Sequence, residues 1–219
     1  MSVYIPVLGF LGTTVGLIRA IPQLVRLLRS RQAHGVSLDT AATSSIVSLC
    51  WVTYGILTRQ PFVCISSGPS AVVFALIAFF AIRFGRSVRE FKIAPFWLIV
   101  LLASGLFAGK SGLGVMLSVS VLVANLPQLW VAHKEGNLAD LSLGTWILSI
   151  SDGLIWGTYS LIQHDISIMA YGLFQLTTSG LIVILKLLHM AREKNLAAGV
   201  ARDAGSISKQ EKNETLDKK

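Results

Sequence analysis

The chain alternates between long apolar stretches and short polar connections, and this alternation is the first guide to its fold. Each apolar stretch approaches the ~20 residues that a helix needs to cross a bilayer. The seven stretches cover residues 4–28, 38–57, 62–82, 93–109, 113–132, 141–162 and 166–188. Because a backbone in lipid must satisfy its own hydrogen bonds, each stretch predicts a helix. The pattern therefore predicts an all-α membrane protein with seven transmembrane helices.

The polar connections differ in charge, and this difference predicts how the chain lies in the membrane. Basic residues concentrate in the cytoplasmic connections of membrane proteins. Eight follow the first, third and fifth stretches: Arg26, Arg29, Arg31, Arg83, Arg86, Arg89, Lys92 and Lys134. Only Arg59 and Lys110 lie in the connections after the second, fourth and sixth stretches. We therefore expect a plasma-membrane protein with its N-terminus outside and its C-terminus in the cytoplasm.

Composition supports a lipid environment and narrows the range of functions. Hydrophobic residues make up 53% of the 219 residues and charged residues only 14%, which is too apolar for an ordinary soluble domain. The sequence shows no cluster of metal ligands, no nucleotide-binding loop and no nucleophile with a general base. We therefore expect no cofactor, no enzymatic activity and no nucleic-acid partner. Gly12-x-x-x-Gly16 and Gly105-x-x-x-Gly109 allow close helix contacts, either in a homo-oligomer or within one chain.

The sequence contains an internal repeat with an offset of 105 residues. Shifted by this offset, Pro22-Gln23-Leu24 falls on Pro127-Gln128-Leu129, and Trp51-x-Thr53-Tyr54 falls on Trp156-x-Thr158-Tyr159. Eleven of the 33 aligned positions from Pro22 to Tyr54 are identical, without a gap. Composition alone would give about two or three identities. The offset carries four stretches, so both copies start on the same side of the membrane and the repeats are parallel.

This duplication divides the chain into four parts. Residues 1–90 and 112–190 are expected to be three-helix repeats, and residues 91–111 a linker helix that returns the chain to its starting side. Residues 191–219 are expected to be a disordered cytoplasmic tail, because they become polar and mixed in charge. Two parallel repeats place a pseudo-twofold axis along the membrane normal, and a solute path can run between them.

An ordered set of short motifs occurs in both repeats. The first copy reads Pro22-Gln23, Gly35-Val36-Ser37-Leu38 and Trp51-x-x-Tyr54-Gly55, and the second reads Pro127-Gln128, Leu141-Ser142-Leu143 and Trp156-x-x-Tyr159. This set resembles the PQ-loop superfamily, especially its SWEET and SemiSWEET branch, over about residues 5–190. The resemblance implies that the third helix of each repeat lies between the first two, and that the halves rock to give alternating access.

Trp51 and Trp156 lie about halfway or further along the second helix of each repeat. Two indole rings that face a central cavity can stack on the apolar faces of a sugar ring while their N–H groups donate hydrogen bonds. Aromatic packing or an interfacial belt is the alternative. The resemblance favours the pocket, because the family's binding tryptophans occupy this place, and it implies that Tyr54 and Tyr159 form the extracellular gate.

One departure from the family concerns the partner of each tryptophan. The resemblance implies an asparagine on the third helix of each repeat, and this chain has Ser67 and Gly172 at about those positions. The polar residues nearby are Ser66, Ser67 and Ser70 in the first repeat, and Tyr171 and Gln175 in the second. We therefore predict an asymmetric site with weaker hydrogen bonding, which leaves the sugar specificity open.

Arg19 and Asp152 place charges inside predicted spans, where ionisable residues are costly and indicate function. Asp152 precedes Trp156 by one helical turn on the same face, so it can line the cavity, bind a cationic or hydroxyl-rich solute, or carry a proton. A structural pair between Arg19 and Asp152 is the alternative. Asn125, close to Pro127, is a further polar candidate for the solute path.

The two Pro-Gln pairs are candidate hinges. A proline inside a helix removes one backbone hydrogen bond and kinks the helix, so Pro22 and Pro127 can bend the cytoplasmic ends of the first and fifth spans. A static kink is the alternative. Gln23 and Gln128 place amides near the freed carbonyls or near the solute path.

Together these features predict a membrane transporter that moves a small polar solute, with a sugar favoured. One alternative is a transporter for an amino acid or another metabolite, coupled to protons through Asp152. The other is a membrane receptor that binds its ligand without moving it, since a fold does not determine function.

Overall fold

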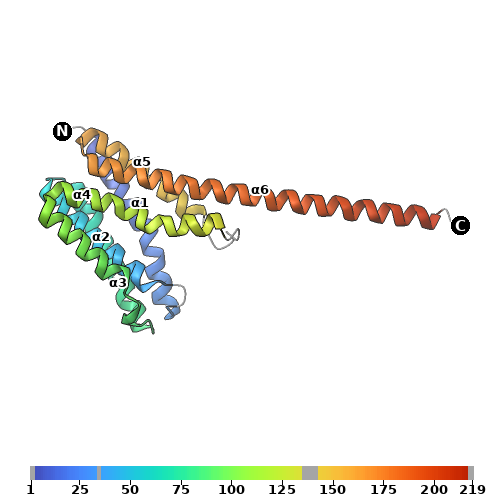
Figure 1. The fold of residues 1–219 in the computed structure, drawn as a ribbon, viewed down its shortest axis with the longest axis horizontal. Coiled ribbons are helices and arrows are strands. Elements are labelled where there is room, and N and C mark those ends of the chain that lie inside the picture. The colour runs from blue at the N-terminus through green and yellow to red at the C-terminus, as the bar shows by residue number, and fades with distance from the viewer. Residues whose placement is uncertain (1–2, 34–35, 135–142, 217–219) are drawn as a thin grey trace.

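The computed structural model describes residues 3–33, 36–134 and 143–216, and this part of the chain holds helices and no strand. The elements are α1 (Tyr4–Ser30), α2 (Leu38–Leu57), α3 (Pro61–Arg83), the short 3-10 helix η1 (Val88–Glu90), α4 (Ile93–Lys134), α5 (Leu143–Gln163) and α6 (Ile166–Leu216). Figure 1 shows their arrangement. The prediction of an all-α chain is confirmed over the described residues.

Five of the described helices are long and apolar enough to cross a membrane. They are α1, α2, α3, α4 over Ile93–Asn125, and α6 over Ile166–Arg192. The backbone of α4 leaves the helical conformation at Gly109, with φ 62° and ψ −154°. Glycine reaches this region without the steric penalty that a side chain imposes. The break falls between the fourth and fifth predicted stretches, and the count of seven spans stays a prediction.

The helices pack as two halves, which we define as α1, α2 and α3 on one side and α4 after Gly109, α5 and α6 on the other. Within the halves, α3 packs against both α1 and α2, and α6 packs against both α4 and α5. The third helix of each half thus contacts the first two, as the resemblance implies. Between the halves, α1 packs against α5 and α2 packs against α4. In both contacts the first helix of one half packs against the second helix of the other half, as expected for parallel repeats.

The halves meet at one end of the molecule and diverge towards the other (Figure 1). The closed end is formed by the start of α1 and the turns after α2 and α5, and its core cluster combines side chains of both halves, including Tyr54, Leu117 and Tyr159. A second core cluster, with Leu27 and Ile77, is built from the first half. We call the opposite end, where this cluster lies, the divergent end.

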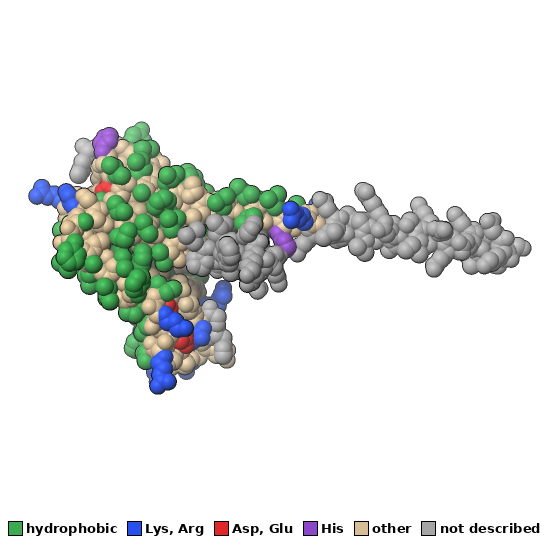
Figure 2. All heavy atoms as spheres, viewed as in Figure 1, with side chains coloured by type: hydrophobic (Ala, Val, Ile, Leu, Met, Phe, Trp, Pro, Cys, Tyr) green, Lys and Arg blue, Asp and Glu red, His purple; other side chains and the backbone are tan. Residues whose placement is uncertain are grey.

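The outer surface of the bundle is apolar. In Figure 2 hydrophobic side chains cover most of the visible face, and Lys and Arg side chains gather at its ends. Several large apolar side chains are almost fully exposed, including Phe107 at 90% and Leu106 at 81%. Side chains of this size face lipid at little cost but would be unfavourable in water. The surface is that of an integral membrane protein.

The last helix is longer than the sequence predicts. α6 continues to Leu216, over residues for which we expected a disordered tail, and Figure 1 shows this part extending away from the bundle. Residues 191–216 are rich in Ala, Lys, Glu and Arg, which are strong helix formers, and contain no proline. Helix propensity accounts for a helix where low hydrophobicity alone predicts disorder.

The start of α4 is attached to the first half by one carboxylate. Asp39, in the first turn of α2, accepts hydrogen bonds from the backbone N–H groups of Lys92, Ile93 and Ala94 at 2.8 to 3.1 Å. A helix leaves such donors unpaired at its N-terminus, and a negative group there also matches the helix dipole. The linker part of α4 is therefore fastened to α2.

Candidate functional site

The two predicted site tryptophans are buried where the halves meet. Trp51 on α2 is 9% exposed and Trp156 on α5 is 7% exposed. Each ring makes an edge-to-face contact with the tyrosine three residues later: Trp51 with Tyr54 at 5.5 Å between centroids, and Trp156 with Tyr159 at 5.2 Å. The pseudo-twofold symmetry therefore includes side chains as well as helices, and both rings belong to the core cluster of the closed end.

The surroundings of the two indoles differ. Trp51 makes a second edge-to-face contact with Tyr171 of α6, at 5.5 Å. Trp156 lies against Gly12 of α1, where an added Cβ would come within 2.8 Å of the ring. The first glycine of Gly12-x-x-x-Gly16 thus makes room for a contact within one chain, which was one of the two roles predicted for that pattern.

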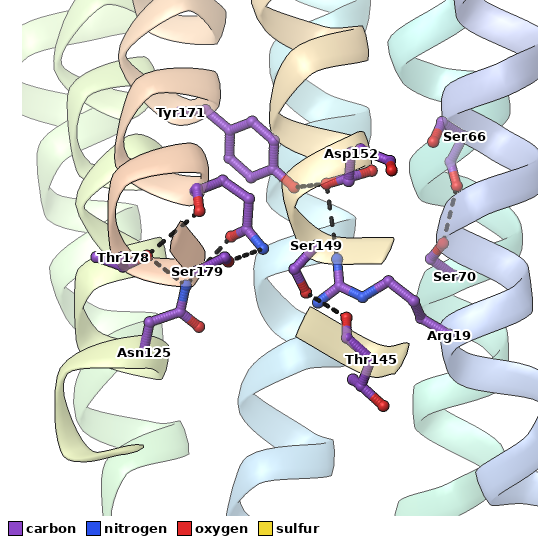
Figure 3. Close-up of polar contacts among 12 residues, drawn as sticks. Arg19, Ser66, Ser70, Asn125, Thr145, Ser149, Asp152, Tyr171, Thr178 and Ser179 are labelled. Atoms are coloured by element: carbon purple, nitrogen blue, oxygen red, sulfur yellow. Dashed lines mark hydrogen bonds and ion pairs between the residues drawn. The ribbon is translucent and has the colours of Figure 1, made fainter. Parts of the chain in front are cut away.

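A charge pair joins the halves beside Trp156. The carboxylate of Asp152 on α5 is buried, and its Oδ2 lies 3.6 Å from Nη1 of Arg19 on α1. The same oxygen accepts a hydrogen bond from the Tyr171 hydroxyl at 2.6 Å (Figure 3). Because Tyr171 also contacts Trp51, one side chain connects the first tryptophan to the buried carboxylate. The pairing of Arg19 with Asp152, which the sequence left as the alternative to a role in the solute path, is present in the structure.

A cluster of hydrogen-bonded amides and hydroxyls extends this polar region within the second half. Asn125 of α4 donates through Nδ2 to Oγ1 of Thr178 at 2.8 Å and to Oε1 of Gln175 at 3.3 Å. Gln175 donates in turn to Ser179 at 3.5 Å. Figure 3 shows these side chains between α4 and α6, on the side of Asp152 away from Arg19. Interhelical hydrogen bonds of this kind hold membrane helices together. Asn125 and Gln175 therefore join α4 to α6 next to the region around Asp152.

The residues at the expected asparagine positions need a correction. Gly172 is buried against α5, and a Cβ added there would lie 2.8 Å from the carbonyl oxygen of Gly153 and from Cα of Gly157. No side chain fits at Gly172, because the two helix backbones touch. The preceding residue, Tyr171, points to Asp152 instead. Gly172 therefore contacts the backbone of α5, Tyr171 is the neighbour whose side chain reaches Asp152, and a ligand role for either residue stays a prediction.

The same shift by one residue applies in the first half. Ser66, which is equivalent to Tyr171 at the offset of 105, is buried, whereas the predicted Ser67 is only partly buried. Ser66 also accepts, through its backbone carbonyl, a hydrogen bond from Ser70 at 3.0 Å. Ser66 rather than Ser67 is the first-half counterpart of the residue that faces the centre.

The closed end is fastened by a carboxylate that the sequence reading did not single out. Asp165, in the turn before α6, accepts hydrogen bonds from the Tyr54 hydroxyl at 2.9 Å and from Nε2 of Gln60 at 2.5 Å. Gln60 and Asp165 are equivalent positions at the offset of 105, so the two turns meet across the symmetry axis. The offset was the only sequence signal for this contact. Tyr54 takes part in this contact, and its role as a gate stays a prediction.

The second gate candidate has a different partner. Tyr159 is fully buried, and its hydroxyl accepts a hydrogen bond from Nε2 of Gln163, one turn further along α5, at 3.3 Å. Tyr54 therefore makes a contact between the halves, whereas Tyr159 makes a hydrogen bond within its own helix.

The candidate hinges are described only in part. Pro22 lies inside α1, which continues through it as a helix, and Pro22 and Gln23 are both exposed. The backbone of Pro127 and Gln128 belongs to α4, and their side chains lie outside the described ones. Within the described part of the chain, no three His, Cys, Asp or Glu side chains come together as ligands for a metal ion.

Comparisons with known proteins agree with this geometry. The family model of the PQ loop repeat matches residues 4–63. A eukaryotic SWEET transporter whose structure was solved at 3.7 Å is similar over 87% of this chain and 100% of its own, with a TM-score of 0.65 and 15% sequence identity. No curated protein matches the sequence. At this identity the similarity shows the fold, and together with the repeat it confirms the resemblance expected from the motifs. The chain therefore contains a PQ loop repeat over residues 4–63 and has a fold similar to that of the SWEET transporter.

Proposed function

We propose that the chain is a transporter that moves a small polar solute across the membrane by alternating access between its two halves. The observation that carries the proposal is the pair of equivalent indoles, Trp51 and Trp156, buried where the halves meet. The contacts of Arg19, Asp152 and Tyr171 lie beside them. A few convergent polar groups among apolar and aromatic side chains are typical of a small-molecule site.

The proposal includes seven spans. The two parts of α4 on either side of Gly109 supply the fourth and fifth spans, and α5 supplies the sixth. α5 is not among the five helices named above, and it carries Asp152 on its buried face. The distribution of basic residues supports an outside N-terminus and a cytoplasmic C-terminus.

Alternating access is supported by the difference between the two ends. Asp165 of the second half holds Tyr54 and Gln60 of the first at the closed end, while the halves diverge at the other end (Figure 1). In the proposed orientation the divergent end is cytoplasmic, so a solute reaches the tryptophans from inside. Release of the Asp165 contacts, with bending at Pro22 and Pro127, would open the site to the outside.

Two solute classes have separate support. The paired indoles favour a sugar, since aromatic faces stack on sugar rings. The buried Asp152 favours an amino acid or another metabolite, with the carboxylate as a proton carrier. A receptor that binds without transport has the same fold available to it.

Uptake by proteoliposomes that hold the purified chain tests the proposal. We expect uptake of a sugar or an amino acid by the wild type, loss of most uptake in Trp51→Ala and Trp156→Ala, and normal uptake in Phe107→Ala, which changes only the lipid-facing surface. A solute that binds the purified chain and never crosses the membrane would refute transport and favour the receptor.

The proton alternative has its own test. If Asp152 carries a proton during transport, Asp152→Asn abolishes the uptake that a pH gradient drives and leaves exchange at equal pH in place. The measurement compares uptake by the wild type and Asp152→Asn at two pH gradients. Equal gradient-driven uptake by both would exclude Asp152 as the proton carrier.

A further inference from the structure

Arg19 stands out because its charge lies inside a membrane span and its guanidinium has few hydrogen-bond acceptors among the described residues. It occupies the middle of α1, and its side chain is 30% exposed. Among the described residues its partner is Asp152, and the 3.6 Å between Nη1 and Oδ2 is too long for a hydrogen bond. A guanidinium carries five N–H donors. Most of the donors of Arg19 thus have no acceptor in the part of the chain that the structure describes.

Asp152 is in the opposite situation. Its side chain is only 4% exposed, and its Oδ2 already accepts the Tyr171 hydroxyl at 2.6 Å. Figure 3 shows the Arg19 side chain reaching from α1 across to α5, with the guanidinium beside Asp152 and Ser149. The pair therefore combines a hydrogen-bonded, enclosed anion with a cation that is open to a further ligand.

We propose that the Arg19 guanidinium binds the carboxylate of the transported solute, which is a small carboxylic acid with an amino or hydroxyl group next to the carboxylate. The planar guanidinium matches a carboxylate with two parallel hydrogen bonds. A neutral sugar supplies acceptors but no negative charge, so its hydrogen bonds to Arg19 are weaker than those of a carboxylate.

Asp152 narrows this class further. Its negative charge lies beside Arg19, so a doubly charged anion such as phosphate would meet like charge at the same place. A single carboxylate carries less negative charge, and an adjacent ammonium or hydroxyl group that donates to Asp152 offsets the remaining repulsion. Trp51, Trp156 and Tyr171 then surround the small apolar remainder of the solute.

This inference rests on the proposed function, so its test separates binding from transport. The probes are L-lactate, L-alanine and D-glucose, each measured for uptake by proteoliposomes and for binding to the purified full chain through tryptophan fluorescence. The variants are Arg19→Gln, Arg19→Lys and the double variant Arg19→Gln/Asp152→Asn, which removes both charges. Arg26→Gln, at an exposed position on α1, is the matched control. Size-exclusion chromatography confirms that each variant is folded.

We expect L-lactate or L-alanine to bind and enter, and D-glucose to do neither. Loss of charge-assisted hydrogen bonds should weaken binding of the acid about 10- to 100-fold in Arg19→Gln and in the double variant. Arg19→Lys should retain part of the binding, and Arg26→Gln all of it. If Arg19→Gln does not fold, the double variant decides, because it leaves no unpaired charge.

Four results have different consequences. Uptake of glucose without either acid overturns this inference and leaves transport standing. Acid binding that is unchanged in the double variant overturns the role of Arg19. Acid binding that depends on Arg19 but is never followed by uptake supports the inference and refutes the transport proposal, and failure of all three probes to bind or enter refutes both.

Discussion

The two halves share one packing scheme but differ in chemistry at equivalent positions. At the offset of 105, an apolar residue of the first half corresponds to a polar residue of the second at four pairs of positions. These pairs are Ala20 and Asn125, Val47 and Asp152, Val73 and Thr178, and Phe74 and Ser179. The first half is held by an apolar core cluster, whereas α4 and α6 of the second half are joined by buried hydrogen bonds. The duplication has kept the fold in both halves and the polar groups mainly in one.

This asymmetry assigns different tasks to the halves. The second half supplies Asp152 and Tyr171, and the first supplies a single charge, Arg19, which reaches across the interface. In the transporter that we propose, binding would therefore depend on contact between the halves, and a movement of one half against the other would change it. Variants that exchange or remove the unequal residues test this comparison.

The largest effect is expected from removing the second half's charge alone. Asp152→Ala leaves Arg19 without a counter-ion inside the membrane, and loss of one member of a buried pair costs about 3 kcal/mol in the free energy of unfolding. The double variant Arg19→Gln/Asp152→Asn should recover most of this loss. Unfolding in detergent measures both. Equal destabilisation by the single and the double variant would mean that the two charges are not coupled.

Asparagine placed at the two equivalent positions on the third helices should act differently. Gly172→Asn forces α6 away from α5, because the backbone of α5 lies 2.8 Å from the new Cβ, and such overpacking costs about 2 to 3 kcal/mol. Ser67→Asn should change the stability little, since Ser67 is only partly buried. Gly157→Ala, where an added Cβ meets nothing within 4 Å, is the control. Thermal unfolding separates the three, and a stable Gly172→Asn would contradict the described helix contact.

The gate tyrosines should also differ. Tyr54→Phe removes a hydrogen bond to the Asp165 carboxylate, which is worth about 1.5 kcal/mol and thus about tenfold in the balance between closed and open states. Tyr159→Phe removes only a long bond to Gln163 on the same helix and should shift this balance less. Labelling of a cysteine introduced beside Trp51 with a membrane-impermeant reagent from the outside measures the shift. Equal labelling in both variants would show that Tyr54 does not hold the closed end.

The duplicated fold could be predicted because it depends on patterns that a sequence displays directly. Apolar stretches long enough to span a bilayer and the offset of 105 led to the helices, the halves and the equivalence of Trp51 and Trp156. Arg19 and Asp152 could be noticed because charges in such stretches are costly. Whether they pair could not be predicted, since that depends on how α1 packs against α5.

Other parts of the site depend on rotation and contact that the sequence does not display. A shift of one residue turns a helical side chain by about 100°, and for this reason Tyr171 rather than Gly172 faces Asp152. Asp165 carried no signal of its own, because an acidic residue in a turn is ordinary and its equivalent is the uncharged Gln60.

The smallest effect concerns the attachment of α4, for which the second half has no equivalent. Asp39 accepts three backbone N–H groups at the start of α4, and the residue at its offset of 105 is Gly144. Asp39→Ala should lower the free energy of unfolding by about 1 kcal/mol, the usual cost of losing a helix cap. Lys92→Ala is the matched control, because it keeps the backbone N–H that Asp39 uses.

The same pair of variants shows whether the linker moves with the first half. If it does, Asp39→Ala also increases hydrogen exchange at the first amides of α4, because their acceptor is lost, and Lys92→Ala does not. Exchange that is equally slow in both variants would mean that α4 is held by its apolar contacts alone. In that case Asp39 would not be a functional difference between the halves. The difference between the halves would then be confined to the polar residues around Asp152.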